Sequence, residues 1–194
     1  MPAVAGRAER VTAASLDLER ILSLVRPSTT SLVSMFHGED HWRKVASIGL
    51  DLAARTPGCD PTVVVLFAVL HDVQRVGDDQ DPPHGARGAA LARSLDLGRF
   101  GFSGEQLALV EAACRDHTGG GLSDDPTIGT CWDADRLTLW RVGIEPAASY
   151  MSTPAGREAA ASGHRFTWLS DWAEVARTLG RTSRRARWPL LRQR

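Results

Sequence analysis

The chain has 194 residues, of which 43% are hydrophobic and 24% charged, and its formal net charge is zero. This length fits one domain with a sizeable core, so we expect residues 1–194 to form a single domain. The balanced charge gives no electrostatic reason to expect nucleic acid or a membrane surface as a partner. No apolar run resembles a signal peptide or a membrane span, and the three cysteines lack metal-type spacing. We therefore expect a cytoplasmic protein with reduced cysteines.

Two helices are predicted in the first third of the chain. Apolar residues at helical spacing indicate a helix that ends at Pro27 and a second helix over about residues 39–55. The apolar stripe of the second helix includes His41, which places this histidine on the face turned to the core. His37 lies one turn earlier on the same face and is an alternative.

The most apolar stretch is a run of eight apolar residues that leads directly into His71 and Asp72. The Asp60-Pro61 pair ahead of this run fits an N-cap and a first-turn proline, so we predict a buried helix over residues 61–76. An ionised carboxylate at the end of such a helix is costly to bury without a partner. A metal ion supplies a partner, and histidine is the commonest metal ligand. For the dipeptide taken alone, a polar helix end facing water is the alternative.

Three further helices are predicted after the acidic loop of residues 77–83, and each has one polar residue on an apolar stripe. The fifth helix is predicted over residues 103–116 and the sixth over residues 126–142. The polar residues of the three stripes are, in chain order, His84, His117 and Asp135. Asp133 must point to a different side from Asp135, and we predict that it orients a ligand from outside the ligand set.

The chain is predicted to close with a helix over residues 166–179. The arginine-rich stretch 181–194 is predicted to be a flexible tail, because charged chain ends are usually solvated. No strand pairs, repeats or low-complexity tracts are evident in the sequence. We therefore predict an all-α fold, a compact helical bundle.

The predicted helices thus put several histidines and aspartates on otherwise apolar stripes. A small core can pair so many buried polar atoms most readily if they share one centre, and a metal cluster is such a centre. Imidazole and carboxylate ligands suit Fe, Mn, Zn, Ni or Co, as one ion or two, without choosing among them. The candidate metal ligands are His41, His71, Asp72, His84, His117 and Asp135.

In its ordered motifs the chain resembles the HD-domain superfamily of metal-dependent phosphohydrolases over residues 37–142. His41, in His-Trp-Arg-Lys-Val, matches the first histidine of the family pattern, and His71-Asp72 matches the pair that gives the family its name. Asp135, in Ala-Asp-Arg-Leu, matches the last aspartate. The resemblance implies a helical bundle of the HD type with a metal core in this range.

Members with two metals, such as the HD-GYP phosphodiesterases and the diiron oxygenases, have two more histidines before the last aspartate. His84 and His117 stand in that order here, whereas a Gly-Tyr-Pro motif is absent. The resemblance implies that Asp72 bridges two ions, one held by residues 41, 71 and 135 and the other by the two additional histidines. Such an ion pair activates a water for attack on a phosphoester.

Three basic residues are candidates for holding a phosphate. Arg75 stands where related families often have a lysine, and its guanidinium offers a rigid fork of donors, so we predict it to be catalytic together with Asp72. Lys44 and Arg87 each follow a candidate ligand by three residues, and surface salt bridges are an equally good explanation for both.

We therefore predict a hydrolase that cleaves a phosphoester, nucleotide or pyrophosphate bond in a small phosphorylated substrate. A diiron oxygenase with the same ligand order and a non-catalytic ligand-sensing module are the alternatives. The loops 77–83 and 118–125 are predicted to shape the pocket, although they carry no recognisable substrate code. A homodimer is the default expectation for the assembly.

Overall fold

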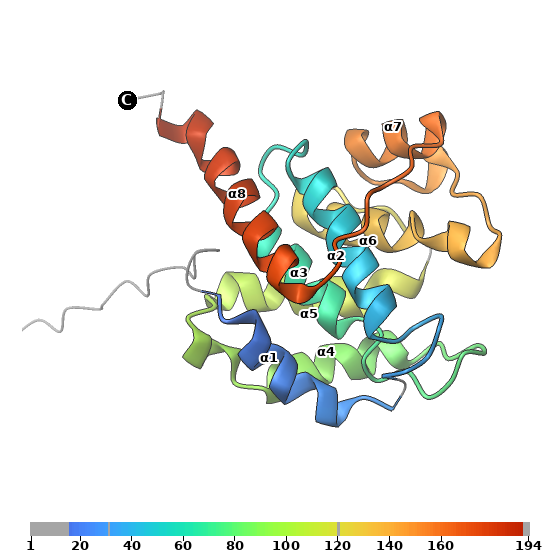
Figure 1. Ribbon diagram of the computed structural model, residues 1–194, viewed down its shortest axis with the longest axis vertical. Coiled ribbons are helices and arrows are strands. Elements are labelled where there is room, and N and C mark those ends of the chain that lie inside the picture. Colours follow the sequence, from blue (N-terminus) through green and yellow to red (C-terminus); the bar gives the residue numbers. More distant parts are fainter. Residues whose placement is uncertain (1–15, 31, 120, 192–194) are drawn as a thin grey trace, which may run out of the picture.

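Figure 1 shows the protein as a computed structural model that describes residues 16–30, 32–119 and 121–191, with the backbone alone for 184–191. Within these ranges the structure consists of α-helices and short 3-10 helices and contains no strand. The all-α prediction is therefore confirmed. No helix in this part of the chain combines the length and the apolar character needed to cross a membrane. The lead-in predicted for residues 1–11 lies outside the described residues.

The central helix is α3 (Pro61–Leu70), and all of its residues are buried. Its first turn is capped as predicted, because the Asp60 carboxylate accepts hydrogen bonds from the backbone N–H groups of Thr62 (2.9 Å) and Val63 (3.4 Å). The helices α2 (Glu39–Ala53), α5 (Gly104–Asp116) and α6 (Pro126–Arg136) pack around it (Figure 1). An element that is apolar on every side thus occupies the position where every side is covered.

The predicted end of this central helix at residue 76 is wrong, because the helix stops at Leu70. The Nδ1 atom of His71 lies 3.3 Å from the carbonyl oxygen of Phe67 and 3.1 Å from that of Ala68, and donates to them. The side chain thereby competes for acceptors that another helical turn would use. The chain turns instead, and the His71-Asp72 pair lies at the exit of the helix.

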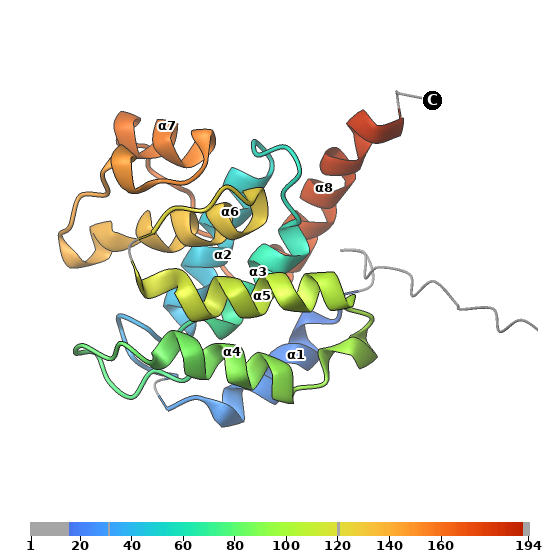
Figure 2. The ribbon, with the colours of Figure 1, turned by 180° about the vertical axis from the view of Figure 1, so that it is seen from behind.

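The helices α4 (His84–Ser94) and α5 form an antiparallel pair, in which α5 passes in front of α3 and α4 lies below α5 in Figure 2. Gly88 lets α4 approach the end of α3, because a Cβ atom there would lie 2.6 Å from the carbonyl oxygen of Leu70 and 3.1 Å from that of His71. Only glycine fits this close contact between two backbones. His84, one turn earlier on α4, is thereby brought to the His71-Asp72 turn.

The predicted sixth helix is also shorter than expected, because α6 ends at Arg136 and not at residue 142. The Thr138 hydroxyl donates to the Asp135 carbonyl oxygen (2.6 Å), and the backbone N–H of Thr138 bonds to the same atom (2.9 Å). These bonds tighten the helix end, and the 3-10 helix η4 (Leu139–Val142) follows.

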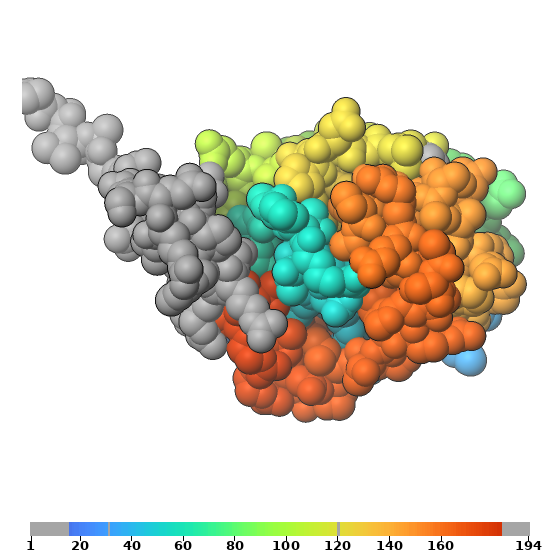
Figure 3. Space-filling model, turned by 90° about the horizontal axis from the view of Figure 1, so that it is seen from above, coloured from blue at the N-terminus to red at the C-terminus, as the bar shows by residue number. Residues whose placement is uncertain are grey.

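The remaining helices complete the outer layer. The 144–164 stretch, predicted to be irregular with a short helix after Pro154, contains that helix as α7, which lies beside the turn between α2 and α3 (Figure 3). The bounds of the other short elements are α1 Leu18–Val25, η1 Arg26–Ser28, η2 Leu97–Phe100, η3 His117–Gly119, η5 Ala148–Tyr150 and α7 Pro154–Ser162.

The last helix, α8 (Trp172–Leu191), begins later and ends later than the predicted 166–179. Its start is set by Asp171, whose carboxylate accepts a hydrogen bond from the backbone N–H of Glu174 (2.7 Å). Buried Trp172 and Leu179 anchor it to the core. Arginine has good helix propensity, so the helix continues through most of the stretch 181–194 that was predicted to be flexible. Residues 192–194 lie outside the described part of the chain.

Candidate metal centre

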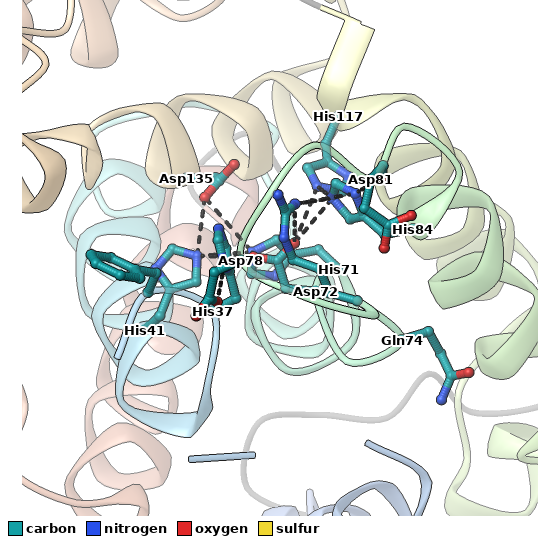
Figure 4. A network of polar contacts seen from close by, with 12 residues as sticks. His37, His41, His71, Asp72, Gln74, Asp78, Asp81, His84, His117 and Asp135 are labelled. Carbon is teal, nitrogen blue, oxygen red and sulfur yellow. Dashed lines mark hydrogen bonds and ion pairs between the residues drawn. The ribbon is translucent and has the colours of Figure 1, made fainter. Parts of the chain in front are cut away.

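The six candidate ligands meet at the exit of α3, although they come from parts of the chain far apart in sequence (Figure 4). His41 lies in the first turn of α2, His84 begins α4, His117 follows α5, and Asp135 lies in the last turn of α6. All but Asp135 are buried. The structure therefore brings together every residue that the sequence analysis proposed as a ligand.

Four of them form what we call the first metal group: His41, His71, Asp135 and the Oδ2 atom of Asp72. His41 Nε2 lies 3.2 Å from His71 Nε2, 3.4 Å from Asp72 Oδ2 and 3.3 Å from Asp135 Oδ1. His71 Nε2 lies 3.4 Å from Asp72 Oδ2 and 3.7 Å from Asp135 Oδ1. Ligand atoms that share one ion at bond lengths of about 2.0–2.2 Å are separated by such distances. The group therefore fits a divalent metal.

The second metal group consists of His84, His117 and the Oδ1 atom of Asp72. His84 Nε2 lies 3.0 Å from His117 Nε2 and 3.1 Å from Asp72 Oδ1, and His117 Nε2 lies 3.7 Å from the same oxygen. The two carboxylate oxygens of Asp72 thus face two different groups. This geometry is what a carboxylate bridging two ions requires.

Backbone carbonyls orient three of the four histidine rings. The Nδ1 atoms of His71, His84 and His117 lie 3.1, 2.5 and 2.7 Å from the carbonyl oxygens of Ala68, Asp81 and Cys114, respectively. A histidine that donates from Nδ1 presents the lone pair of Nε2, and metal-binding histidines usually have such a partner. The fourth, His41, has a buried Nδ1 atom for which the described residues provide no partner.

Charge within the cluster also calls for a cation. Burial lowers the pKa of His71, but the carboxylates of Asp72 and Asp135 outweigh it and raise this pKa to about 10. Burial raises the pKa of Asp72, yet the surrounding histidines hold it well below its usual range, and the same balance applies to Asp135. The two carboxylates thus demand positive charge, which protons on the histidines or a divalent metal can supply.

A cavity of about 390 Å³ opens beside the two metal groups. Gln80, Asp81 and Pro82 from the first predicted pocket loop line it, and Thr118 comes from the second. The cavity is also lined by the ligands Asp72, His84, His117 and Asp135. A small molecule that enters the cavity therefore meets both groups.

Arg75 reaches this cavity, as predicted, although it lies in the turn after α3 and not in a helix. Its Nε and Nη2 atoms donate to the carbonyl oxygens of Gly77 (3.0 Å) and Asp79 (2.8 Å). Its Nη1 atom lies 3.9 Å from Asp72 Oδ1. The guanidinium group is thereby held at the edge of the second metal group.

The structure does not bring Lys44 and Arg87 into the cavity. The ammonium group of Lys44 lies 2.6 Å from Asp40 Oδ2, and Arg87 donates to the carbonyl oxygen of Gln74 and pairs with Asp81. Each residue follows a ligand by three positions, an offset of about 60° around the helix, and its charged group pairs with a carboxylate instead of lining the cavity. The alternative given for both, a salt bridge, describes their contacts.

The sequence analysis missed Arg141, which lines the cavity on the side of the first metal group. Its Nε atom donates to the carbonyl oxygen of Phe36 (3.1 Å). Burial lowers the pKa of Arg141 below its usual value, although the carboxylates of Asp135 and Asp72 oppose this shift. On the continuous helix that was predicted, position 141 would point about 120° away from position 135. The change from α6 to η4 redirects the chain, so that Arg141 can face the cavity. No pattern in the sequence predicted this change.

Two other polar residues have different roles from those expected. Asp133 does not orient a metal ligand: its carboxylate accepts hydrogen bonds from the backbone N–H groups of Ser152 (2.6 Å) and Thr153 (2.8 Å) and so anchors the start of α7. His37, the alternative to His41, pairs with Asp78 (2.9 Å) at the cavity wall and belongs to neither metal group.

Comparison with known proteins gives one informative similarity. No protein-family model and no curated protein sequence matches the chain. The crystal structure of a predicted HD superfamily hydrolase from an uncultured Thermotogales bacterium is similar, with 28% sequence identity and a TM-score of 0.57. The match covers 75% of this chain and 83% of that one. The similarity thus includes sequence as well as fold.

Proposed function

We propose that the chain is a metal-dependent phosphohydrolase of the HD-domain superfamily with a dinuclear centre. The observation that carries this proposal is the position of Asp72, whose two oxygens face separate groups of histidines beside an arginine-lined cavity. Such a centre suits the cleavage of a phosphoester, nucleotide or pyrophosphate bond in a small substrate.

In this proposal the residues of the first metal group would hold one divalent ion and those of the second group another, and Asp72 would contribute to both. Bound divalent metals lower the pKa of a coordinated water and neutralise charge that develops on the phosphoryl group. The chain itself provides the orientation: the carbonyl partners of His71, His84 and His117 keep each Nε2 atom directed at the centre. The low pKa values of Asp72 and Asp135 keep both carboxylates ionised at neutral pH.

The substrate phosphate is proposed to lie between Arg75 and Arg141. Both guanidinium groups line the cavity, one beside each metal group, and guanidinium binds phosphate oxygens with two parallel hydrogen bonds. Lys44 and Arg87 have no part in this proposal, because each pairs with an aspartate and neither lines the cavity. The positive charge of the two arginines therefore favours an anionic substrate.

An activity screen tests the proposal directly. The metal-stripped protein is supplied with Mn²⁺, Co²⁺, Ni²⁺ or Mg²⁺ and offered phosphomonoesters, phosphodiesters, nucleotides and pyrophosphate, and phosphate release is measured. We expect turnover with at least one combination, loss of turnover in Asp72→Ala, and an increase in KM of roughly tenfold or more in Arg75→Met and Arg141→Met. Lys44→Met serves as the matched control and should keep the KM of the wild type.

The ligand order also occurs in diiron oxygenases, so the same protein preparation is analysed for iron and for oxygen uptake. Iron in the purified protein together with substrate-dependent oxygen consumption, and no phosphate release in the screen, would overturn the hydrolase proposal.

A further inference from the structure

The two metal groups differ in the charge that surrounds them. The first group includes two carboxylates, Asp135 and the shared Asp72, whereas the second has only the shared one. The second group also has a cation beside it, because the Nη1 atom of Arg75 lies 3.3 Å from Nε2 of His84 and 3.9 Å from Oδ1 of Asp72. These are the atoms that the second group would offer to an ion.

The guanidinium group of Arg75 is fixed in this position. Its Nε and Nη2 atoms are bonded to the carbonyl oxygens of Gly77 and Asp79, and its side chain is only 13% exposed. It cannot leave the second group without losing two hydrogen bonds. Arg141, the other arginine of the cavity, has its hydrogen bonds to Phe36 and Thr138 and not to a ligand residue.

From this asymmetry we propose that Arg75 couples binding of the second metal ion to binding of phosphate. Like charges at such short range repel, and burial reduces the screening by solvent and salt. A phosphate held by Arg75 places negative charge between the guanidinium and the second group, so the repulsion becomes attraction. The first ion thus binds by itself, and the second binds together with the anion.

The inference rests on the proposed function, because it takes Arg75 as the phosphate-binding residue. Its consequence is specific to the substrate class: a phosphate group would favour occupancy of the second metal group, and a neutral molecule would not. Water would then meet the complete centre mainly when a phosphorylated substrate is in the cavity.

Titration of the metal-stripped full-length protein with Mn²⁺, followed by calorimetry and electron paramagnetic resonance, tests the proposal without turnover. The resonance spectrum distinguishes a single ion from a coupled pair. In the wild type we expect the second ion to bind at least roughly tenfold more weakly than the first, and inorganic phosphate to strengthen the second step by at least roughly tenfold. In Arg75→Met the second ion should bind at least about tenfold more tightly without phosphate, and phosphate should have little effect.

Lys44→Met is the matched control, since it removes one positive charge on α2 from a side chain that lies outside the cavity. It should reproduce both steps of the wild type. Equal affinities for the two ions in the wild type, no second ion even with phosphate, or an unchanged second step in Arg75→Met would each overturn the coupling. If Arg75→Met does not fold, as judged by circular dichroism, the phosphate effect in the wild type decides.

The two proposals can fail separately. A protein that shows the phosphate-dependent second step but cleaves no phosphoester or pyrophosphate refutes the hydrolase proposal and leaves the coupling intact. A protein that hydrolyses phosphoesters and loads both ions equally well without phosphate refutes only the coupling.

Discussion

Replacing Gly88 by alanine is expected to disturb both the stability of the protein and the alignment of its two metal groups. The added methyl carbon would lie 2.6 Å from the carbonyl oxygen of Leu70 and 3.1 Å from that of His71. Both contacts are with backbone at the exit of the most buried helix, so α4 must move away. Because α4 carries His84 while the exit of α3 carries Asp72, this movement separates ligands of the second metal group.

The cost follows from the size of the clash. Overpacking of one methyl group against rigid backbone typically destabilises a protein by about 1–3 kcal/mol. For a chain of this length, that change lowers the melting temperature by roughly 3–9 °C. Differential scanning calorimetry and urea denaturation of the metal-free protein measure this change, and Mn²⁺ titration then measures whether the second step weakens more than the first.

Gly104→Ala provides the control, because a Cβ atom at this first position of α5 meets no atom within 4 Å. Its stability should stay within about 0.5 kcal/mol of the wild type. The reasoning would be refuted if Gly88→Ala melted at the wild-type temperature and bound both ions with wild-type affinity.

Three other substitutions test separate parts of the structure. His117→Ala should remove one ion and keep the other, because this residue belongs only to the second metal group, and elemental analysis should find one ion per chain instead of two. Asp133→Ala should cost about 1–3 kcal/mol by leaving buried N–H groups without an acceptor, and limited proteolysis should then cut first within residues 144–164. Hydrogen bonds from Arg26 lower the pKa of Glu39 below its ordinary value of 4.5, so the carboxylate adds stability above that pH and loses it as the pH falls through the folded value. The difference in unfolding free energy between the wild type and Glu39→Gln should therefore shrink below about pH 4.5, and a difference that stays constant between pH 7 and pH 3 would contradict this assignment.

The starts of the helices around the site could be predicted from the sequence, whereas their ends could not. Asp60 and Asp125 each precede a proline, and both carboxylates cap the helices that follow, because an N-cap depends on local chemistry. The ends at residues 70 and 136 depend on side chains that compete for backbone acceptors, namely the His71 ring and the Thr138 hydroxyl. Such competition is decided by tertiary packing and leaves little trace in hydrophobic periodicity.

The ligand set could be predicted because buried polar residues at helical spacing are rare and need a common partner. Arg141 and Asp133 could not, for two reasons. Arg141 reaches the cavity only because the helix changes to a 3-10 turn. Asp133 is satisfied by the start of α7, a helix that follows it in the chain and has no large apolar residue of its own. Positive charge close to a ligand in the sequence was also misleading, because Lys44 and Arg87 pair with aspartates and do not line the cavity.

The wide spacing of the ligands along the chain has a consequence for the lifetime of the protein. Within the first metal group, His41 and His71 are 30 residues apart, and His84 and His117 of the second are separated by 33. An ion that joins such positions acts as a reversible cross-link, since the unfolded chain must close long loops to form the same contacts. At a free concentration of 100 times its dissociation constant, an ion adds about 2.7 kcal/mol to the unfolding free energy. Resistance to proteases is therefore expected to increase and decrease with the concentration of available metal.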